Sequence, residues 1–300
     1  MNAAATAFPL KKGDEILTTN MEHAGGTGMW EMKADKEKLK IRKVDLPFRP
    51  ADKAELLELF RKNITRKTRV ITFSHIMFTN GMLLPAREIC ELARSRGIVT
   101  VIDGAHSPCL TVVDLHEMGC DFFASSLHKW LLAPRGVGML YVRKGLFSER
   151  KLYPLIASIG WDKRENYAAI FETIGTINMG PSAGLEKSLE FFNLIGKKRI
   201  CDRIKELNNY LYDKLQNIKG IDIFSPGNAD LRTGIVAFRI DNVAFSTVAA
   251  KLWEMGKVRV RQISEYNYNL IRLSTHIYNT KAEIDRVCGF LETISKGAGN

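Results

Sequence analysis

The sequence predicts an α/β protein built on a mostly parallel sheet. Between about residue 14 and residue 142, short apolar runs alternate with helix-like stretches, an alternation typical of βαβ units. One run is apolar almost throughout, as expected of a strand buried on both faces of a sheet. The predicted strands are EILTT (15–19), RVITFS (69–74), GIVTVID (97–103), DFFAS (121–125) and GMLYV (138–142).

Helices are predicted between these strands at 51–63 and 84–97, and the charged stretch 33–43 is also assigned to a helix. Pro85 stands near the start of its helix, where a missing amide proton costs little, and Gly97 follows the last turn as a C-cap. The chain opens in what looks like the body of a helix, with no preceding strand. We therefore expect an upstream segment of the fold to be missing from it.

The pattern changes after residue 181. It is helical to about residue 217 and then gives short strand-like pieces with two helical stretches. This predicts a smaller α+β C-terminal domain, with a boundary in the helical stretch around 190–200. We assign residues 1–195 to a large domain and 196–300 to the small one.

Composition indicates an ordinary globular enzyme-sized chain. Its 300 residues are 45% hydrophobic, and no apolar run reaches the roughly 20 residues that span a bilayer. The five cysteines show no CxxC pair or metal-ligand spacing, which favours a cytoplasmic protein without a metal site. The formal charge of +11 is scattered over helical segments, so we predict no nucleic-acid or membrane partner, although a positive field would favour anionic ligands.

Lys129, in SSLHKW, is the most informative residue. It follows a predicted strand and lies twenty-six residues beyond Asp103 of VIDGAHS, which ends another. An aldehyde cofactor such as pyridoxal phosphate needs an amine to hold it and a carboxylate to keep its ring nitrogen protonated. Ligands of open α/β sheets bind at the carboxyl ends of strands, so Lys129 and Asp103 can supply both groups.

Further candidates stand at predicted strand ends. His23, His75, His106 and His128 are four of the six histidines, and each follows a strand or a punctuated segment. Ser126 and His128 flank Lys129 and can hydrogen-bond phosphate oxygens, although a simple turn would use the same residues.

Two anion-binding residues are predicted further along the chain. Thr176 follows Gly175 before a helix, where a hydroxyl and backbone amides can bind an anion or simply cap the helix. Arg272, in LIRLSTHIYNT, lies on a predicted strand among apolar and small residues, where a guanidinium needs an anion. That anion is a substrate carboxylate or the acid of a structural ion pair.

The motifs together resemble the class V aminotransferase family of pyridoxal-phosphate enzymes, of fold type I. They are VIDGAHS, SSLHKW, APRGVGMLYVRKG, GTINMGPSAGLEKSL and IRLSTHIYNT, in order through nearly the whole chain. Within the family, the EHAGG loop, the histidine of DGAH and the APRGVG turn are most similar to the isopenicillin N epimerase-like branch.

The resemblance implies a role for each candidate. Lys129 forms the Schiff base with the cofactor, Asp103 pairs with its pyridine nitrogen, and Arg272 binds the substrate α-carboxylate. It also implies that His23 stacks on the cofactor ring opposite Lys129, where it acts as a catalytic proton donor or simply blocks that face. The remaining residues would contact the cofactor's polar groups: His106 and His75 the ring hydroxyl, Ser126 and His128 the phosphate, and Thr176 a phosphate across the interface of a homodimer.

Several activities share the first step that this constellation predicts. The substrate amino acid loses its Cα proton to the freed lysine, and epimerisation, transamination or elimination of a β-substituent can follow. Cysteine desulfurases of the family carry a nucleophilic cysteine before the carboxylate-binding arginine, whereas this chain reads RVRQISEYNYNLIR there. Sulfur transfer through a persulfide is therefore disfavoured, and the resemblance implies an epimerase-like enzyme. An aminotransferase, a carbon–sulfur lyase or a truncated, catalytically silent dimeric module are the alternatives.

Overall fold

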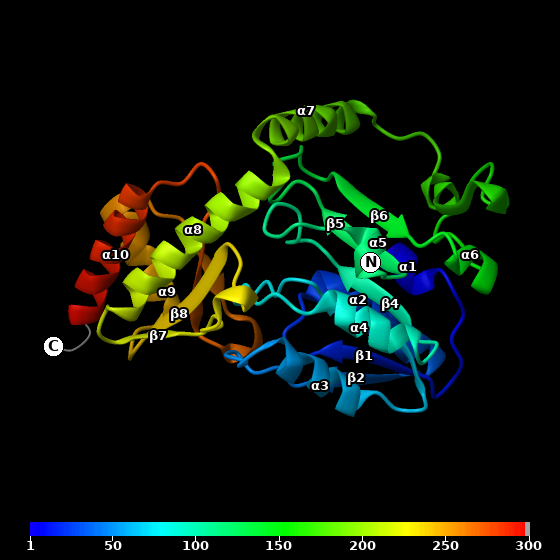
Figure 1. Ribbon diagram of the computed structural model, residues 1–300, viewed down its shortest axis with the longest axis horizontal. Helices are drawn as coiled ribbons and strands as arrows, with labels where there is room; N and C mark the ends of the chain where they lie inside the picture. The colour runs from blue at the N-terminus through cyan, green and yellow to red at the C-terminus, as the bar shows by residue number, and fades with distance from the viewer. Residues whose placement is uncertain (298–300) are drawn as a thin grey trace.

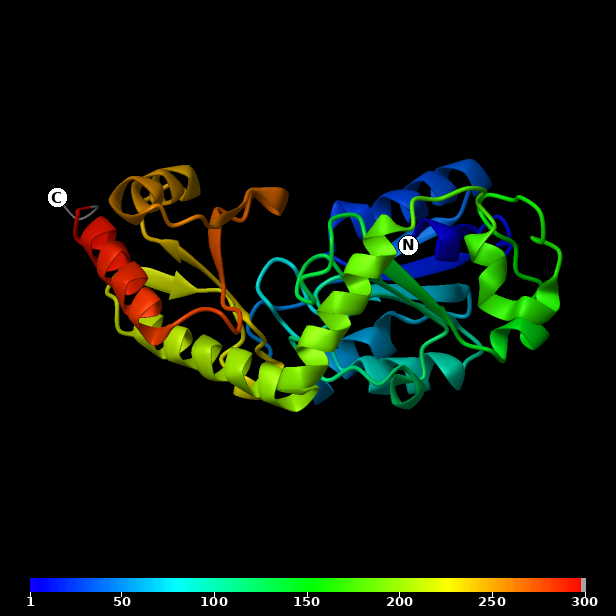
Figure 2. The same cartoon turned by 90° about the horizontal axis from the view of Figure 1, so that it is seen from above.

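The computed structural model describes residues 1–297, which form two lobes, each built around a sheet (Figures 1 and 2). The larger lobe holds a six-stranded sheet in the order β2-β1-β3-β4-β5-β6. Its strands are β1 (Glu15–Thr19), β2 (Lys40–Val44), β3 (Thr68–Ser74), β4 (Val99–Asp103), β5 (Phe122–Ser126) and β6 (Gly138–Val142).

The sheet is parallel from β2 to β5, and β6 alone pairs antiparallel, with β5. The predicted mostly parallel sheet is thus confirmed. Because β1, β3, β4 and β5 run the same way, the loops that follow them meet at one edge of the sheet. This edge carries the candidate residues.

Helices cover both faces of this sheet. Phe122 and Phe123 are neighbours on β5, yet they pack in different apolar cores because successive strand side chains point to opposite faces. The helices of this lobe are α1 (Asn2–Thr6), α2 (Ala24–Glu37), α3 (Lys53–Asn63), α4 (Ala86–Arg94), α5 (Leu115–Met118), α6 (Leu146–Glu149), the 3-10 segment η1 (Arg164–Glu172) and α7 (Gly180–Ile195).

The helix predicted at 33–43 is wrong beyond residue 37. Lys38 adopts a left-handed conformation with φ 56°, which ends α2, and β2 begins two residues later. Strand β2 lies at the edge of the sheet and is mostly exposed, with only Val44 fully buried. Its lysines and arginine obscure the alternation of apolar and polar residues that would indicate a strand. Positive charges of this kind are common on edge strands.

The smaller lobe is α+β, as predicted. Its antiparallel sheet has the order β7-β8-β10-β9, and helices pack on it around a second core. The elements are α8 (Lys197–Gln216), β7 (Ile221–Ile223), η2 (Ala229–Leu231), β8 (Ile235–Ile240), α9 (Phe245–Gly256), β9 (Arg261–Ile263), η3 (Glu265–Asn267), β10 (Leu270–Ser274) and α10 (Lys281–Lys296).

Helix α8 connects the two lobes (Figure 2). It starts directly after Gly196, whose φ of 94° breaks the helical stretch. The loop after β3 also joins the lobes: Asn80 donates to Phe224 O at 3.1 Å, and Ser225 Oγ donates to Asn80 O at 2.5 Å. The division of the chain at residue 195 stays a prediction, and the break at Gly196 falls beside it.

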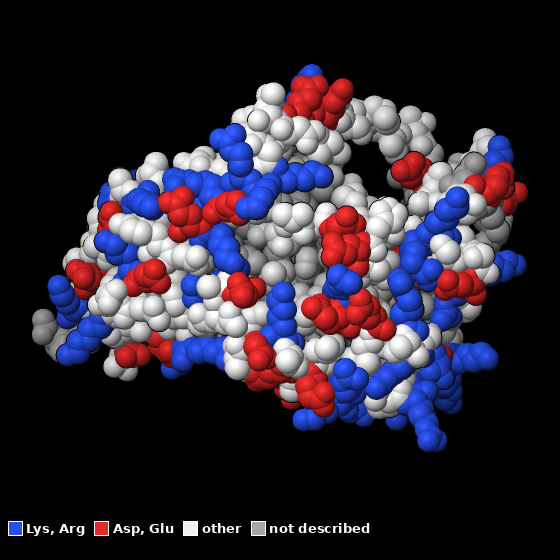
Figure 3. All heavy atoms as spheres, in the orientation of Figure 1, with Lys and Arg blue, Asp and Glu red and all other residues white. Residues whose placement is uncertain are grey.

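The surface carries both signs of charge. Figure 3 shows lysines and arginines spread over both lobes and interspersed with acidic residues. Among the described residues, no helix combines the length and the apolar character that a membrane span requires.

Candidate active site

Loops at the carboxyl edge of the large sheet enclose a cavity of about 680 Å³. Five predicted residues line it. His23 caps α2, Asp103 ends β4 and Ser126 ends β5. The other two follow these strands: His106 lies in the loop after β4, and Lys129 lies in the turn after β5. The parallel sheet therefore gathers residues that are more than a hundred positions apart in the sequence.

Asp103 is the last residue of β4, and its carboxylate is held in place by its neighbours. Its Oδ1 accepts a hydrogen bond from the Ala105 amide at 2.9 Å. Gly26 of α2 approaches Oδ2 so closely that a Cβ there would lie 2.8 Å from it. Only a glycine fits at this position without displacing the carboxylate.

The solvent-accessible surface area of Lys129 is that of an exposed residue. Its side chain is nevertheless surrounded mostly by protein, because it stands in the wall of a wide cavity. Burial lowers the pKa of its ammonium; Asp103 opposes this effect, and Arg272 adds to it. The lysine Nζ lies 3.4 Å from His106 Nε2.

His106 is buried and held by Trp130, a residue that the sequence did not single out. The indole Nε1 donates to His106 Nδ1 at 2.9 Å. An indole N–H can only donate, so Nδ1 is unprotonated and the neutral ring carries its proton on Nε2, facing Lys129. Burial lowers the pKa of His106 well below its usual range, which keeps the ring neutral. Lys129 therefore meets an N–H donor, and the unprotonated amine suits that partner best.

His23 faces the same space. Its Nδ1 accepts from the Gly25 amide at 3.0 Å, and its ring packs edge-on against Phe78 with 5.0 Å between centroids. Burial lowers its pKa, and the positive charge of Lys129 lowers it further.

A second cavity, of about 380 Å³, adjoins the first and shares His23, Phe78, His106 and Lys129 with it. Arg272 of β10 reaches it from the small lobe. One Nη donates to Phe78 O at 2.6 Å, while the buried Nε has no partner within the described chain. Burial lowers the pKa of this guanidinium to about 10, and Arg261 contributes. Within residues 1–297 Arg272 forms no ion pair, so the structural ion pair considered above is absent there, and Arg272 has capacity for an anion.

Three predicted residues lie away from the two cavities. His75 is buried beneath the site, with Nδ1 3.0 Å from Ser107 Oγ, and burial lowers its pKa to about 4. His128 is exposed and donates from Nδ1 to Val137 O at 3.2 Å. Thr176 is exposed in the loop before α7. Their roles toward a cofactor stay predictions.

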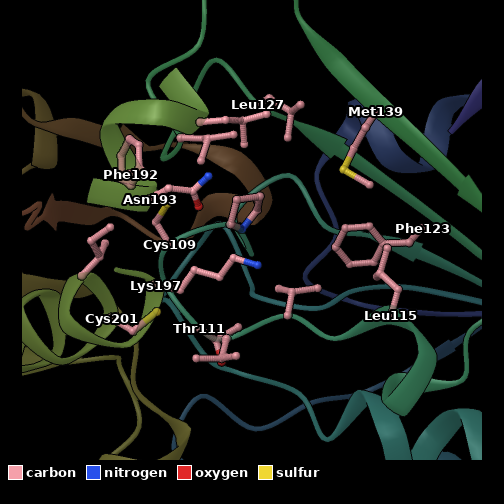
Figure 4. Close-up of a pocket in the computed structure, with 16 residues that line it drawn as sticks. Cys109, Thr111, Leu115, Phe123, Leu127, Met139, Phe192, Asn193, Lys197 and Cys201 are labelled. Atoms are coloured by element: carbon pink, nitrogen blue, oxygen red, sulfur yellow. The ribbon is translucent and has the colours of Figure 1, made fainter. Parts of the chain in front are cut away.

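A third cavity, of about 240 Å³, is apolar (Figure 4). It lies between the loop after β4 and the helices α7 and α8, and Lys197 points its amino group into it. None of the predicted site residues lines it.

A family model described as Aminotransferase class-V matches residues 1–287. The chain belongs to the class V aminotransferase family. It is a pyridoxal-5'-phosphate enzyme, as its sequence motifs predicted. The residues present fit that cofactor: a cavity bordered by the Lys129 amine and the Asp103 carboxylate, with Gly26 leaving room beside the latter.

Relatives in the family have different activities. The chain is 32% identical to the isopenicillin N epimerase of Streptomyces clavuligerus, over 98% of this chain and 77% of that protein. It is 29% identical to a probable cysteine desulfurase of Halalkalibacterium halodurans, over 97% of this chain and 73% of that protein. A solved cystine C–S lyase in complex with cysteine persulfide superposes with a TM-score of 0.86 at 23% identity, covering 97% of this chain and 78% of that one. This last likeness supports the fold.

Proposed function

We propose that the protein epimerises an amino acid, with Lys129 and His23 as the two groups that exchange the Cα proton. The observation that carries this proposal is that both side chains line both cavities, beside Asp103 in one and Arg272 in the other. The resemblance to isopenicillin N epimerase over nearly the whole chain agrees with it.

Lys129 would hold the cofactor through Nζ, Asp103 would pair with its ring nitrogen, and Ser126 would contact its phosphate. When bound, pyridoxal phosphate withdraws electrons from the amino acid and makes its Cα proton acidic. Arg272 would bind the α-carboxylate through two parallel hydrogen bonds, using the Nε that has no partner in the described chain. These contacts would fix Cα between the two proton carriers.

Lys129 and His23 suit proton exchange because burial lowers the pKa of both, so each gives up a proton more readily than the free side chain does. The unprotonated group takes the Cα proton on one face, and the other, protonated, gives its proton to the opposite face. The two groups then exchange protons with water and return to their starting states, so no oxidant or reductant is needed. The His106 Nε2–H favours the unprotonated amine at Lys129 and so prepares it as a base.

Sulfur transfer through a cysteine persulfide is disfavoured. None of the five cysteines lines the two cavities, and the loop between β9 and β10 holds none. Burial raises the pKa of every one of these thiols, so they are protonated and weakly nucleophilic.

The test is Cα proton exchange in D2O. The purified chain with pyridoxal phosphate is incubated with isopenicillin N and with a panel of L-amino acids. The products are separated on a chiral column, and their deuterium content is measured by mass spectrometry. Epimerisation gives the inverted isomer carrying one deuterium. Keto acid without inversion would identify an aminotransferase, and pyruvate with sulfide from cysteine would identify a lyase.

Variants separate the residues. Borohydride treatment should fix the cofactor on Lys129, and Lys129→Ala should abolish this adduct and all exchange. His23→Phe should keep the adduct and the aromatic ring but lower inversion by at least tenfold, because one proton carrier is lost. Inversion at the unmodified rate in His23→Phe would refute the two-base assignment.

We also propose that the chain forms a homodimer. Apolar side chains are exposed along residues 156–194, and Ile159 is 95% exposed and Leu194 85% exposed. Such a surface is typical of a protein–protein interface, and Thr176 lies within the same segment. Light scattering should give twice the mass of one chain, and Leu194→Glu should shift the equilibrium toward the monomer. A monomer at micromolar concentration would contradict this proposal.

A further inference from the structure

Arg261 of β9 stands directly opposite Arg272 of β10 in the antiparallel register of the small sheet. Like charges on facing residues repel one another, and Arg261 contributes to the lowered pKa of Arg272. An arrangement of this kind is stabilised by anions that bind between or beside the two guanidinium groups.

Both arginines line two neighbouring cavities. The first is the 380 Å³ cavity that contains Lys129, and the second, of about 590 Å³, extends past β9 and includes Arg259 and Ser264. Arg261, Arg272 and Ser274 line both. A ligand anchored at Arg272 can therefore extend beyond Arg261.

The charge on these walls is one-sided. Lys129, Arg259, Arg261 and Arg272 line the two cavities, whereas no described aspartate or glutamate does. Glu265 pairs with Arg261 from outside these linings, and one α-carboxylate neutralises only one further group. The field that remains favours a second negative charge.

Arg261 has donors to spare. In the described chain its only hydrogen bond runs from Nη2 to Glu265, four residues later, and its side chain is 47% exposed. A guanidinium has five N–H donors arranged in a fork, so the pair with Glu265 leaves an edge for another carboxylate.

We infer that the substrate is an amino acid whose side chain ends in a second anionic group, and that Arg261 binds this group. The inference deepens the proposed function and rests on it, because it takes Arg272 as the site of the α-carboxylate. A distal carboxylate bound here lies on the side of Arg272 toward β9. Arg259 lines the same outer cavity and can reinforce the binding of a longer side chain.

The test compares two unreactive ligands by calorimetry on the chain loaded with pyridoxal phosphate. Glutarate and valerate have the same number of carbons, but only glutarate has a second carboxylate. A charge-assisted hydrogen bond predicts that glutarate binds about tenfold to a hundredfold more tightly. Arg261→Gln should bring the two affinities within about threefold by weakening glutarate alone.

Controls make the outcome specific. Arg272→Gln should weaken both ligands, and unchanged valerate binding in Arg261→Gln shows that this variant is folded. Arg87→Gln removes an equivalent arginine that pairs with Glu91 outside the site, and it should change neither affinity. Equal binding of glutarate and valerate to the unmodified chain, or a preference that survives Arg261→Gln, would overturn the inference. Failure of the proposed function would show separately, as absence of the inverted isomer carrying deuterium in the exchange assay.

Discussion

Replacing Trp130 with phenylalanine tests how the contact with His106 affects the pKa of Lys129, which burial already lowers. The indole donates to His106 Nδ1 at 2.9 Å, and both residues are buried. Phenylalanine preserves much of the aromatic volume and the stack on His276, whose ring lies 5.5 Å away, but it removes the donor. His106 Nδ1 then has no partner, which lowers the free energy of unfolding by about 1–3 kcal/mol.

The substitution should also change the protonation of the site. Without the indole N–H, His106 can carry its proton on Nδ1 and present Nε2 as an acceptor to Lys129, 3.4 Å away. An acceptor stabilises the ammonium, so we expect the pKa of Lys129 to rise toward its ordinary value. The fraction of unprotonated amine at pH 7 falls, and the cofactor reacts more slowly with the chain.

Two measurements check this reasoning. Long-range ¹H–¹⁵N spectra of histidine-labelled chain should show His106 as the Nε2–H tautomer, and Trp130→Phe should shift it toward the other tautomer. The rate of cofactor incorporation against pH should move to higher pH in the same variant. Trp253→Phe, at an exposed tryptophan of α9, is the matched control and should change neither result. An unchanged tautomer and an unchanged pH profile in Trp130→Phe would refute the argument.

Three further outcomes are expected. Glu22 is buried and accepts hydrogen bonds from Ser74 and Thr19, and burial raises its pKa to about 7, so the folded chain holds this proton more tightly than the unfolded chain does. The contribution of Glu22 to the free energy of unfolding should therefore fall by about 3 kcal/mol between pH 4.5 and 7. Denaturation of Glu22→Gln across that range should show a correspondingly weaker decline in stability. Gly26→Ala places a Cβ 2.8 Å from Asp103 Oδ2, so fluorescence titration should show at least tenfold weaker cofactor binding, and an unchanged affinity would mean that α2 moves freely. Asp103→Asn removes the carboxylate charge and should slow Cα deuterium exchange by at least tenfold while the adduct on Lys129 persists.

The sequence predicted the large-lobe sheet well because its inner strands, β1, β3, β4 and β5, are mostly buried and read as largely apolar runs. Strand β2 escaped this signal, since it lies at the edge and carries Lys40, Arg42 and Lys43. Local composition there resembles a charged helix, and only its pairing with β1 reveals the strand.

The same distinction applies to the site. That Lys129, Asp103 and His23 lie together was predictable because each stands next to a strand or helix end, and parallel topology brings such ends together. The places of Trp130 and Arg261 beside them were not, because these depend on partners far away in the chain. The hydrogen bond from Trp130 spans 24 positions, and the register that sets Arg261 beside Arg272 depends on how β9 pairs with β10. An alternation of apolar residues specifies a strand but not its partner's register.

The two lobes carry different residues of the proposed site, so their relative position sets its geometry. Lys129, Asp103 and His23 belong to the large lobe, whereas Arg272 and Arg261 belong to the small one. Arg272 donates to Phe78 O at 2.6 Å, so the residue proposed to hold the α-carboxylate is itself fixed to the loop that packs against His23. Tyr266 adds a second link, donating to Glu22 O at 2.6 Å, next to His23 in the chain. These two hydrogen bonds tie the small lobe to the large-lobe segments beside His23, so they fix the distance of the proposed carboxylate site from both His23 and Lys129.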